Sequence, residues 1–212
     1  MLSRCRHAFD EYRAGRIATF LSGFIDLDDR VLDCGCGRMI VARSVRERMA
    51  IEIFGVDVIN LNETDIPLCI YDGGRLPFAD NSFDIAYLAF VLHHTLDPRK
   101  VMRECLRVVR RWVIVLEDVY GNKLDLALLK ALDWIGNRPF CSAMSLPYHF
   151  KSTGEWMSIF HDLGAKVVRQ ENVRPLPWRP TRHRMFVVEA GSRDRRMEFD
   201  ASPPCPLARH ML

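Results

Sequence analysis

The chain has 212 residues, of which 49% are hydrophobic and 27% are charged, an ordinary balance for a globular domain. This length suffices for one domain with a sizeable core. The formal net charge of +3 is too small to indicate a nucleic-acid-binding protein by itself. No segment approaches the run of about 18 apolar residues that a membrane-spanning helix requires.

The cysteines and the amino-terminal residues both favour a cytoplasmic protein. The 7 cysteines are odd in number and lack paired metal-ligand spacing, which favours reduced thiols. Cys34 and Cys36 are too close for a Cys-x-x-Cys zinc arrangement. Residues 1–16 are charged and lack the apolar core of a signal peptide. We therefore expect a cytoplasmic location, no membrane span and no metal site.

Apolar runs alternate with amphipathic segments along most of the chain. The pattern predicts helices, in chain order, over residues 9–24, 39–49, 98–109, 124–134 and 153–162. It predicts strands over residues 30–34, 52–56, 68–71, 83–89, 112–116, 165–170 and 184–190. This alternation predicts a Rossmann-like, doubly wound α/β fold whose sheet is mostly parallel, with helices on both faces and an antiparallel pair at one edge.

The same pattern suggests how the chain is organised. We expect residues 1–190 to form a single domain, with residues 118–151 as an insertion that covers a substrate. Ser152 or Thr153 is expected to cap the helix that follows the insertion, with Glu155 in its first turn. Residues 191–212 carry three prolines and no periodic pattern, so we expect a mobile tail there.

The most informative segment is Val31–Gly37, in which an apolar run ends in Asp33 and is followed by two glycines. Gly35 and Gly37 lack Cβ atoms where a strand must turn sharply into a helix and where a ligand must approach the backbone. The free N–H groups of the following helix would point at that ligand. A second apolar run ends at Asp57, where an acid can bind the two hydroxyls of a ribose.

The turn differs from the sequences that bind pyrophosphate. A dinucleotide fingerprint would place a third glycine at Ile40, and the lysine and serine or threonine of a P-loop are absent. A cofactor that has a ribose but no phosphate fits better, and S-adenosylmethionine is the common one.

Several ordered motifs resemble those of the class I S-adenosylmethionine-dependent methyltransferases, in the type-11 branch that acts on small molecules. The resemblance covers about half the chain, from Arg16 to Glu117. Its motifs are residues 31–37, residues 54–58, residues 71–78, and residues 80–86 together with residues 91–94.

The resemblance implies an S-adenosylmethionine site at the carboxyl edge of the sheet. Asp57 would bind the ribose, Asp72 the adenine amino group, and Asp33 the cofactor's ammonium group. Asp33 could instead cap a helix, Asp72 could be an ordinary turn residue, and Leu76 could be plain core. The implied cofactor-binding residues are Asp33, Gly35, Cys36, Gly37, Asp57, Val58, Asp72, Gly73, Leu76 and Phe90.

The chain departs from the family pattern in two places. Met39 stands where the family usually has another glycine, and we expect its side chain to crowd the methionine tail of the cofactor or to change its affinity. Asp57 and Asp72 are only 15 positions apart, so we expect a loop where the family usually has a helix.

Histidines follow the fourth strand, where the methyl group should emerge. His93 or His94 could act as a general base, since imidazole titrates near neutral pH, or could only pack in the loop. Polar and aromatic groups further on could contact the acceptor, could be solvated, or could form a dimer contact. These candidate substrate-binding residues are Glu117, Asp118, Tyr120, Trp134, Tyr148 and His149.

Together these features predict methyl transfer from S-adenosylmethionine to a small, partly apolar acceptor, with S-adenosylhomocysteine as product. Two alternatives stay open: a non-catalytic subunit that binds a partner, and an RNA methyltransferase. Residues 166–212 carry ten Lys or Arg against five Asp or Glu. Such an excess is more often a solvated surface than a nucleic-acid site. A homodimer is also left open.

Overall fold

The computed structural model describes residues 2–137 and 147–190. Its helices are α1 (Leu2–Leu21), α2 (Ile40–Met49), η1 (Leu92–His94, one 3-10 turn), α3 (Pro98–Val108), α4 (Lys123–Asn137) and α5 (Thr153–Asp162). Its strands are β1 (Val31–Cys34), β2 (Ile53–Asp57), β3 (Leu68–Ile70), β4 (Phe83–Ala89), β5 (Val109–Val119), β6 (Lys166–Val173) and β7 (Arg182–Glu189).

The strands form one sheet of 7 strands in the order β3-β2-β1-β4-β5-β7-β6. The strands from β3 to β5 are parallel, while β7 is antiparallel to both β5 and β6. The predicted α/β fold with antiparallel strands at one edge is therefore confirmed. The strand order reverses between β1 and β4, which is where open α/β sheets bind ligands.

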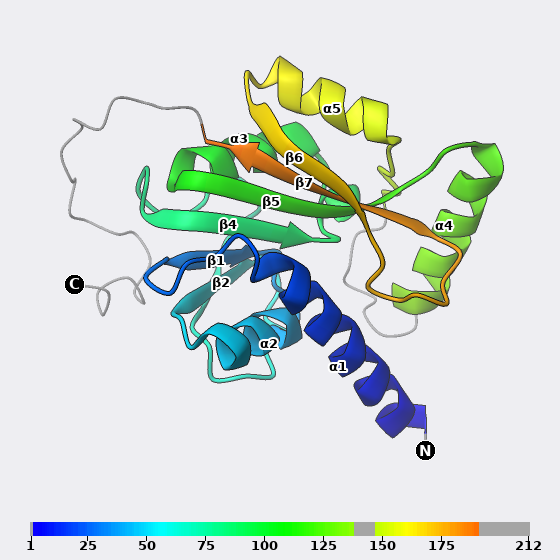
Figure 1. Cartoon of the computed structure of the whole chain (residues 1–212), viewed down its shortest axis with the longest axis horizontal. Coiled ribbons are helices and arrows are strands. Elements are labelled where there is room, and N and C mark those ends of the chain that lie inside the picture. Colours follow the sequence, from blue (N-terminus) through cyan, green and yellow to red (C-terminus); the bar gives the residue numbers. More distant parts are fainter. Residues whose placement is uncertain (1, 138–146, 191–212) are drawn as a thin grey trace.

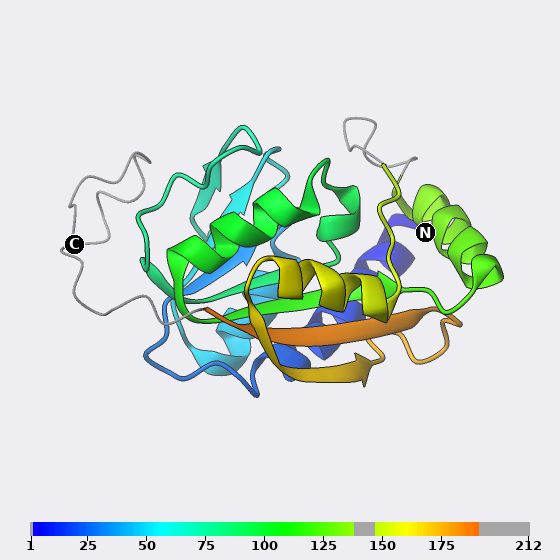
Figure 2. The same ribbon diagram turned by 90° about the horizontal axis from the view of Figure 1, so that it is seen from above.

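Helices cover both faces of the sheet (Figures 1 and 2). On one face, α1 and α2 pack on the sheet through Ile17, Leu21 and Val45. On the other face, α3 and α5 pack through Met102 and Trp156. The fourth helix, α4, stands apart from these layers, beyond the end of the sheet to which the β4 arrow points (Figure 1).

Local signals in the sequence set the helix starts. The Asp97 carboxylate accepts hydrogen bonds from the N–H groups of Arg99 and Lys100, and Pro98 occupies the first turn of α3. Ser152 and Glu155 form a reciprocal capping box at the start of α5. The predicted cap of α5 is confirmed, with Ser152 as the capping residue.

Three differences from the sequence-based prediction concern element bounds. The first helix begins at Leu2 rather than at residue 9. Strand β5 runs to Val119, so Glu117 and Asp118 lie within the strand and not beyond it. Strand β7 begins at Arg182 rather than at residue 184. The long β5–β7 pairing explains the extension of β5, because its last residues pair with those of an antiparallel neighbour that the local sequence does not identify.

The expected loop between β2 and β3 is confirmed, since residues 58–67 contain no helix. No helix in the described part of the chain is long and apolar enough to cross a membrane. The predicted tail at residues 191–212 and residues 138–146 of the predicted insertion lie outside the described residues.

Candidate functional site

The carboxyl ends of β1, β2, β4 and β5 meet at one edge of the sheet because these strands are parallel. The turns after them bring together the glycines, acids and histidines that the sequence singled out. Helix α4 lies beyond the same edge (Figure 1). This edge is the candidate site.

The two glycines of the turn after β1 have different roles. Gly35 has φ +77°, and a Cβ there would lie 2.4 Å from Cγ1 of Val91, so the missing side chain lets two loops pack together. Gly37 has φ +51°, and a Cβ there would meet nothing within 4 Å. Gly37 therefore leaves open space against the backbone, as a bound ligand would require.

Asp57 lies at the end of β2 and is tied to the glycine turn. Its Oδ2 accepts a hydrogen bond from the N–H of Gly37 at 2.7 Å, and its Oδ1 accepts one from the N–H of Val58 at 2.7 Å. These bonds fix the carboxylate beside the open face of Gly37. An acid held there can accept hydrogen bonds from ribose hydroxyls.

Asp33, at the third position of β1, is buried. Burial raises the pKa of Asp33 to about 7; the Tyr87 hydroxyl opposes this rise, and the charge of Asp57 adds to it. The structure holds a carboxyl group that is poised to ionise near neutral pH. A ligand ammonium group close to it would favour the ionised form.

Met39 does not behave as the sequence suggested. Its backbone is in the left-handed region at φ 59°, and its side chain is fully buried. A Cβ added at Gly55 of β2 would lie 2.4 Å from the Met39 terminal methyl carbon, so this side chain fills the hollow over Gly55. Met39 thus packs into the core between α2 and the sheet. The expected crowding of a cofactor tail has no support in this conformation.

The remaining predicted cofactor residues lie in the segments after β1, β2, β3 and β4. Val58 is half exposed, Leu76 is buried in the core, and Phe90 is buried with φ 64°. The Asp72 carboxylate accepts a hydrogen bond from the N–H of Gly74 at 2.8 Å. Gly73 has φ +77° and Cys36 is partly buried beside Gly55.

His93 is held by a buried carboxylate. Its Nδ1 lies 2.6 Å from Oε2 of Glu117, whose Oε1 accepts a hydrogen bond from the N–H of Leu92 at 2.7 Å. Burial alone would lower the pKa of His93, but Glu117 and Asp133 outweigh it and raise the pKa to about 10. In this arrangement His93 is protonated at neutral pH.

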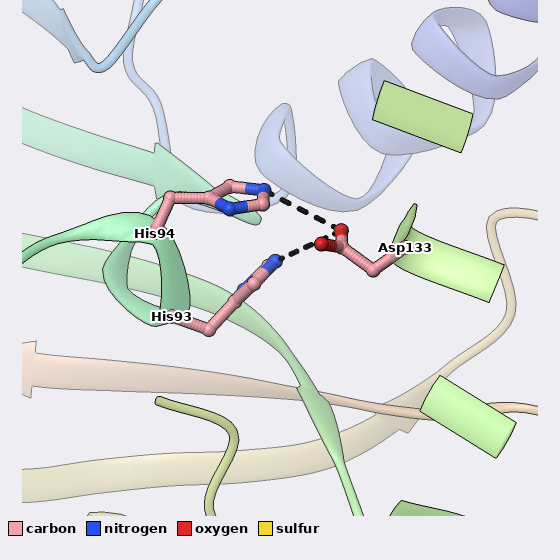
Figure 3. A group of neighbouring side chains, drawn as sticks. All are labelled: His93, His94 and Asp133. Carbon is pink, nitrogen blue, oxygen red and sulfur yellow. Dashed lines mark ion pairs between the residues drawn. The ribbon is translucent and has the colours of Figure 1, made fainter. Parts of the chain in front are cut away.

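His94 and Asp133 complete a three-residue group with His93 (Figure 3). His94 Nε2 lies 3.5 Å, and His93 Nε2 3.7 Å, from the same Asp133 oxygen, Oδ1. Burial and the charge on His93 lower the pKa of His94 to about 4, so His94 is neutral at neutral pH. The two histidines come from η1 and the acid comes from α4.

Further charged groups that the sequence did not single out lie behind this group. His183 of β7 forms an ion pair with Asp118 at 2.5 Å, because the two residues are directly opposite in the β5–β7 ladder. The Arg13 guanidinium of α1 lies 4.4 Å from the ring centre of Phe90 and interacts with the charge of Asp118. Only strand pairing and helix packing identify Arg13 and His183, so the linear sequence carried no signal for them.

The other predicted substrate residues lie in different surroundings, and only some of them are close to the histidines. The Tyr120 hydroxyl donates a hydrogen bond to Glu155 at 2.7 Å, which ties it to α5. Trp134 is exposed on α4. The N–H of His149 donates to the backbone oxygen of His93 at 3.1 Å, so this segment lies against the histidines.

An aromatic ring lies next to the same histidines. Phe150 is buried and stacks on the ring of His93, with ring centres 4.5 Å apart and 20° between the planes. The ring centres of Tyr148 and Phe150 are 6.5 Å apart. The site thus combines ionisable groups with an apolar wall.

These residues fit a ligand with a ribose and an ammonium group. The open face of Gly37, the fixed Asp57 carboxylate and the buried Asp33 lie at the ends of two adjacent strands. The turn after β1 contains no lysine that could bind a pyrophosphate. Its one cation, Arg38, donates hydrogen bonds to Asp10 and Glu63 instead.

Comparison with known proteins agrees with this geometry. Residues 32–115 match the family described as "Methyltransferase domain", type 11. The chain is 35% identical over 104 residues to the demethylmenaquinone methyltransferase of Thermotoga maritima, an alignment that covers 44% of this chain and 45% of that one. It is 46% identical over 100 residues to the enzyme of the same name from Paenarthrobacter aurescens, covering 43% of this chain and 40% of that one.

A similar fold occurs in a solved S-adenosylmethionine-dependent methyltransferase from Aquifex aeolicus. The TM-score is 0.62 at 16% identity, and the match covers 89% of this chain and 97% of that chain. The chain spans less than half the length of the two curated relatives. The family match includes His93 and His94 but ends before Glu117 and Asp133.

Proposed function

Because the chain belongs to the class I S-adenosylmethionine-dependent methyltransferases, in the type-11 family, we propose that it transfers a methyl group to a small, partly apolar acceptor. The cofactor is S-adenosylmethionine, whose sulfonium supplies an electrophilic methyl group when bound. One observation carries the proposal: the Gly37 N–H fixes the Asp57 carboxylate at 2.7 Å, beside backbone that is open to a ligand.

In this proposal the strand ends bind and orient the cofactor. Asp57 accepts hydrogen bonds from the ribose hydroxyls, and Asp33 holds the ammonium group. Gly37 admits the methionine part against the backbone. The chain's main contribution to the rate is then the in-line placement of the acceptor and the exclusion of water from the site.

When no other ligand is bound to them, the two histidines would contribute differently to methyl transfer. His93, protonated between Glu117 and Asp133, has no free lone pair for a proton and serves to position the loop. His94 is neutral and can accept a proton from an acceptor hydroxyl. An acceptor that is already a carbon or nitrogen nucleophile would need no base.

The apolar wall supports an acceptor with a ring or a hydrocarbon part. Phe150, stacked on His93, offers a flat surface beside the polar group. The two matched bacterial enzymes are named for demethylmenaquinone, which has such a ring. We propose an acceptor of this general chemistry, bound between η1, Phe150 and α4.

Calorimetric titration with S-adenosylmethionine and S-adenosylhomocysteine tests the proposal. We expect micromolar binding that Asp57→Ala weakens by about 30-fold or more, since a hydrogen bond to a charged group contributes roughly 2 kcal/mol. Asp28→Ala is the matched control, because Asp28 is an exposed aspartate before β1, at the opposite end of the sheet. No heat and no thermal shift at millimolar ligand would contradict the proposal and favour a non-catalytic, partner-binding role.

The RNA alternative has its own test. If the basic carboxy-terminal part binds RNA, the affinity must fall steeply as salt rises, because phosphate contacts release counterions. Binding without salt dependence, or no binding, would exclude that alternative. We expect no binding.

A further inference from the structure

We propose that His93, His94 and Asp133 bind a divalent transition-metal ion, a site that would sit beside the cofactor edge and hold an oxygen-bearing acceptor. One ligand atom from each residue lies within 4.8 Å of the other two. Figure 3 shows the three side chains converging from η1 and from α4. The inference goes beyond the proposed methyl transfer and can be tested without it.

The spacing of the three side chains leaves room for an ion. The two contacts to Asp133 Oδ1 measure 3.5 and 3.7 Å, which is longer than a good direct hydrogen bond. Ligands on a tetrahedral zinc ion at ordinary bond lengths lie about 3.3 Å apart. The two histidine–carboxylate distances exceed this value by only a few tenths of an ångström. The two histidine ligand nitrogens, which lie within 4.8 Å of each other, would come closer by rotation of their side chains.

A carboxylate behind the site already orients one ligand. Glu117 is fully buried and holds Nδ1 of His93 at 2.6 Å, which turns Nε2 toward Asp133. Histidines that bind metals commonly donate their other ring nitrogen to a carboxylate in this way, because it fixes the tautomer and strengthens the ligand. The hydrogen bond from Leu92 N–H to the other Glu117 oxygen holds that carboxylate in place.

The local charges favour a cation. Three carboxylates face this region, from Glu117, Asp118 and Asp133, and their side chains are at most 16% exposed. Asp118 faces Arg13 and pairs with His183, whereas Glu117 and Asp133 face the two histidines. A metal ion bound to His93 Nε2 would add positive charge where these carboxylates are desolvated.

The donor set indicates the class of metal. Two imidazoles and one carboxylate suit Zn²⁺, Fe²⁺ or Co²⁺ and are poor ligands for Mg²⁺ or Ca²⁺, which prefer oxygen. Three protein ligands are also typical of catalytic sites, which keep an open position for water or substrate. A ligated His94 could no longer accept a proton, so the ion would take over its role toward an acceptor hydroxyl.

Metal titration of the whole chain, without cofactor or acceptor, tests the site. We expect the metal-stripped protein to bind one Co²⁺ per chain, with visible absorption bands that report nitrogen ligands, and Zn²⁺ to displace it. Millimolar Mg²⁺ should not compete. His94→Ala and Asp133→Asn should each abolish the bands, and Glu117→Gln should weaken binding by about tenfold or more.

His161→Ala is the matched control, because His161 is 92% exposed on α5 and should leave Co²⁺ binding unchanged. Circular dichroism and S-adenosylmethionine binding of the same variants show whether each one is folded. The absence of stoichiometric Co²⁺ binding would overturn the inference, as would binding that survives in folded His94→Ala and Asp133→Asn. Cofactor binding is measured separately, so failure of the metal site and failure of the methyltransferase proposal give different results.

Discussion

The two halves of the candidate site are built in different ways. The half that we propose binds the cofactor, called the cofactor half, consists of the turns after β1, β2 and β3, where backbone geometry and single acids define the candidate site. The acceptor half consists of side chains from η1, β5 and α4 that converge on one point. The first half depends on local chain conformation, whereas the second depends on tertiary packing. Substitutions in the two halves should therefore affect stability and cofactor binding differently.

The largest expected effect is in the acceptor half. Glu117→Ala would leave the buried His93 without the closer of its two carboxylate partners and would remove the acceptor for Leu92 N–H. Breaking a buried ion pair in this way destabilises a fold by about 3–5 kcal/mol. Urea denaturation at pH 7 measures the loss.

Glu117→Gln is the matched variant, because it keeps an acceptor for Leu92 and removes only the charge. We expect it to lose about 1–2 kcal/mol. A Glu117→Gln variant as stable as the native chain would mean that the charge on Glu117 does not matter. The acceptor half would then not depend on the His93 ion pair.

The next effect is a pH dependence in the cofactor half. The pKa of Asp33 is raised to about 7 in the fold, so the folded state favours the protonated group. The contribution of Asp33 to the stability of the ligand-free protein should therefore be greatest below about pH 4 and should fall between about pH 4 and pH 7, by roughly 2–4 kcal/mol.

Asp33→Asn should remove this fall, since an amide does not titrate. Above pH 7 we expect the variant to be more stable than the native chain but weaker in S-adenosylmethionine binding, because the ammonium group loses its carboxylate. Thermal unfolding and calorimetry across this pH range provide both measurements. If Asp33→Asn binds the cofactor as tightly as the native chain does at pH 8, Asp33 does not bind the ammonium group.

The two turn glycines separate folding from binding within the cofactor half. Gly35→Ala combines left-handed strain with a contact of 2.4 Å to Val91 and should cost roughly 2–3 kcal/mol of stability. Gly37→Ala meets no neighbour and should cost only about 1 kcal/mol, but its methyl group should hinder the cofactor. Denaturation and calorimetry on both variants check the contrast. If Gly37→Ala bound the cofactor normally, the open face of Gly37 would not be the ligand's position.

The contrast between the halves also explains what the sequence could predict. The turn residues Gly35, Gly37 and Asp57 lie next to the strands that position them, so a linear pattern could predict the fold, which is confirmed, and could propose this part of the site. Asp133 is 39 positions after His94, on a helix that the local pattern could predict but could not place. A search for ligands at close spacing therefore predicted no metal site, and that prediction stays untested until metal is titrated.

The end of β5 and the packing of Met39 could not be predicted for the same reason. Glu117 and Asp118 were expected beyond β5 because the residues after Leu116 are polar. Their pairing with Arg184 and His183 of β7, more than 60 positions later, keeps them in the strand. Likewise, the sequence shows that Met39 replaces a glycine but not where its side chain points, which depends on the hollow over Gly55.

The smallest effect on the cofactor half is expected at Met39. Met39→Gly would relieve left-handed strain of about 1–2 kcal/mol but would empty the space over Gly55, where loss of a buried methionine side chain costs about 2–5 kcal/mol. A net loss of about 1–2 kcal/mol should follow in urea denaturation. Because the side chain points into the core, S-adenosylmethionine affinity should stay within about twofold of the native value. A clear gain in affinity would show instead that the Met39 side chain leaves this hollow and competes with the cofactor. The crowding expected from the sequence would then be correct, and the buried position of Met39 would not describe the cofactor-bound protein.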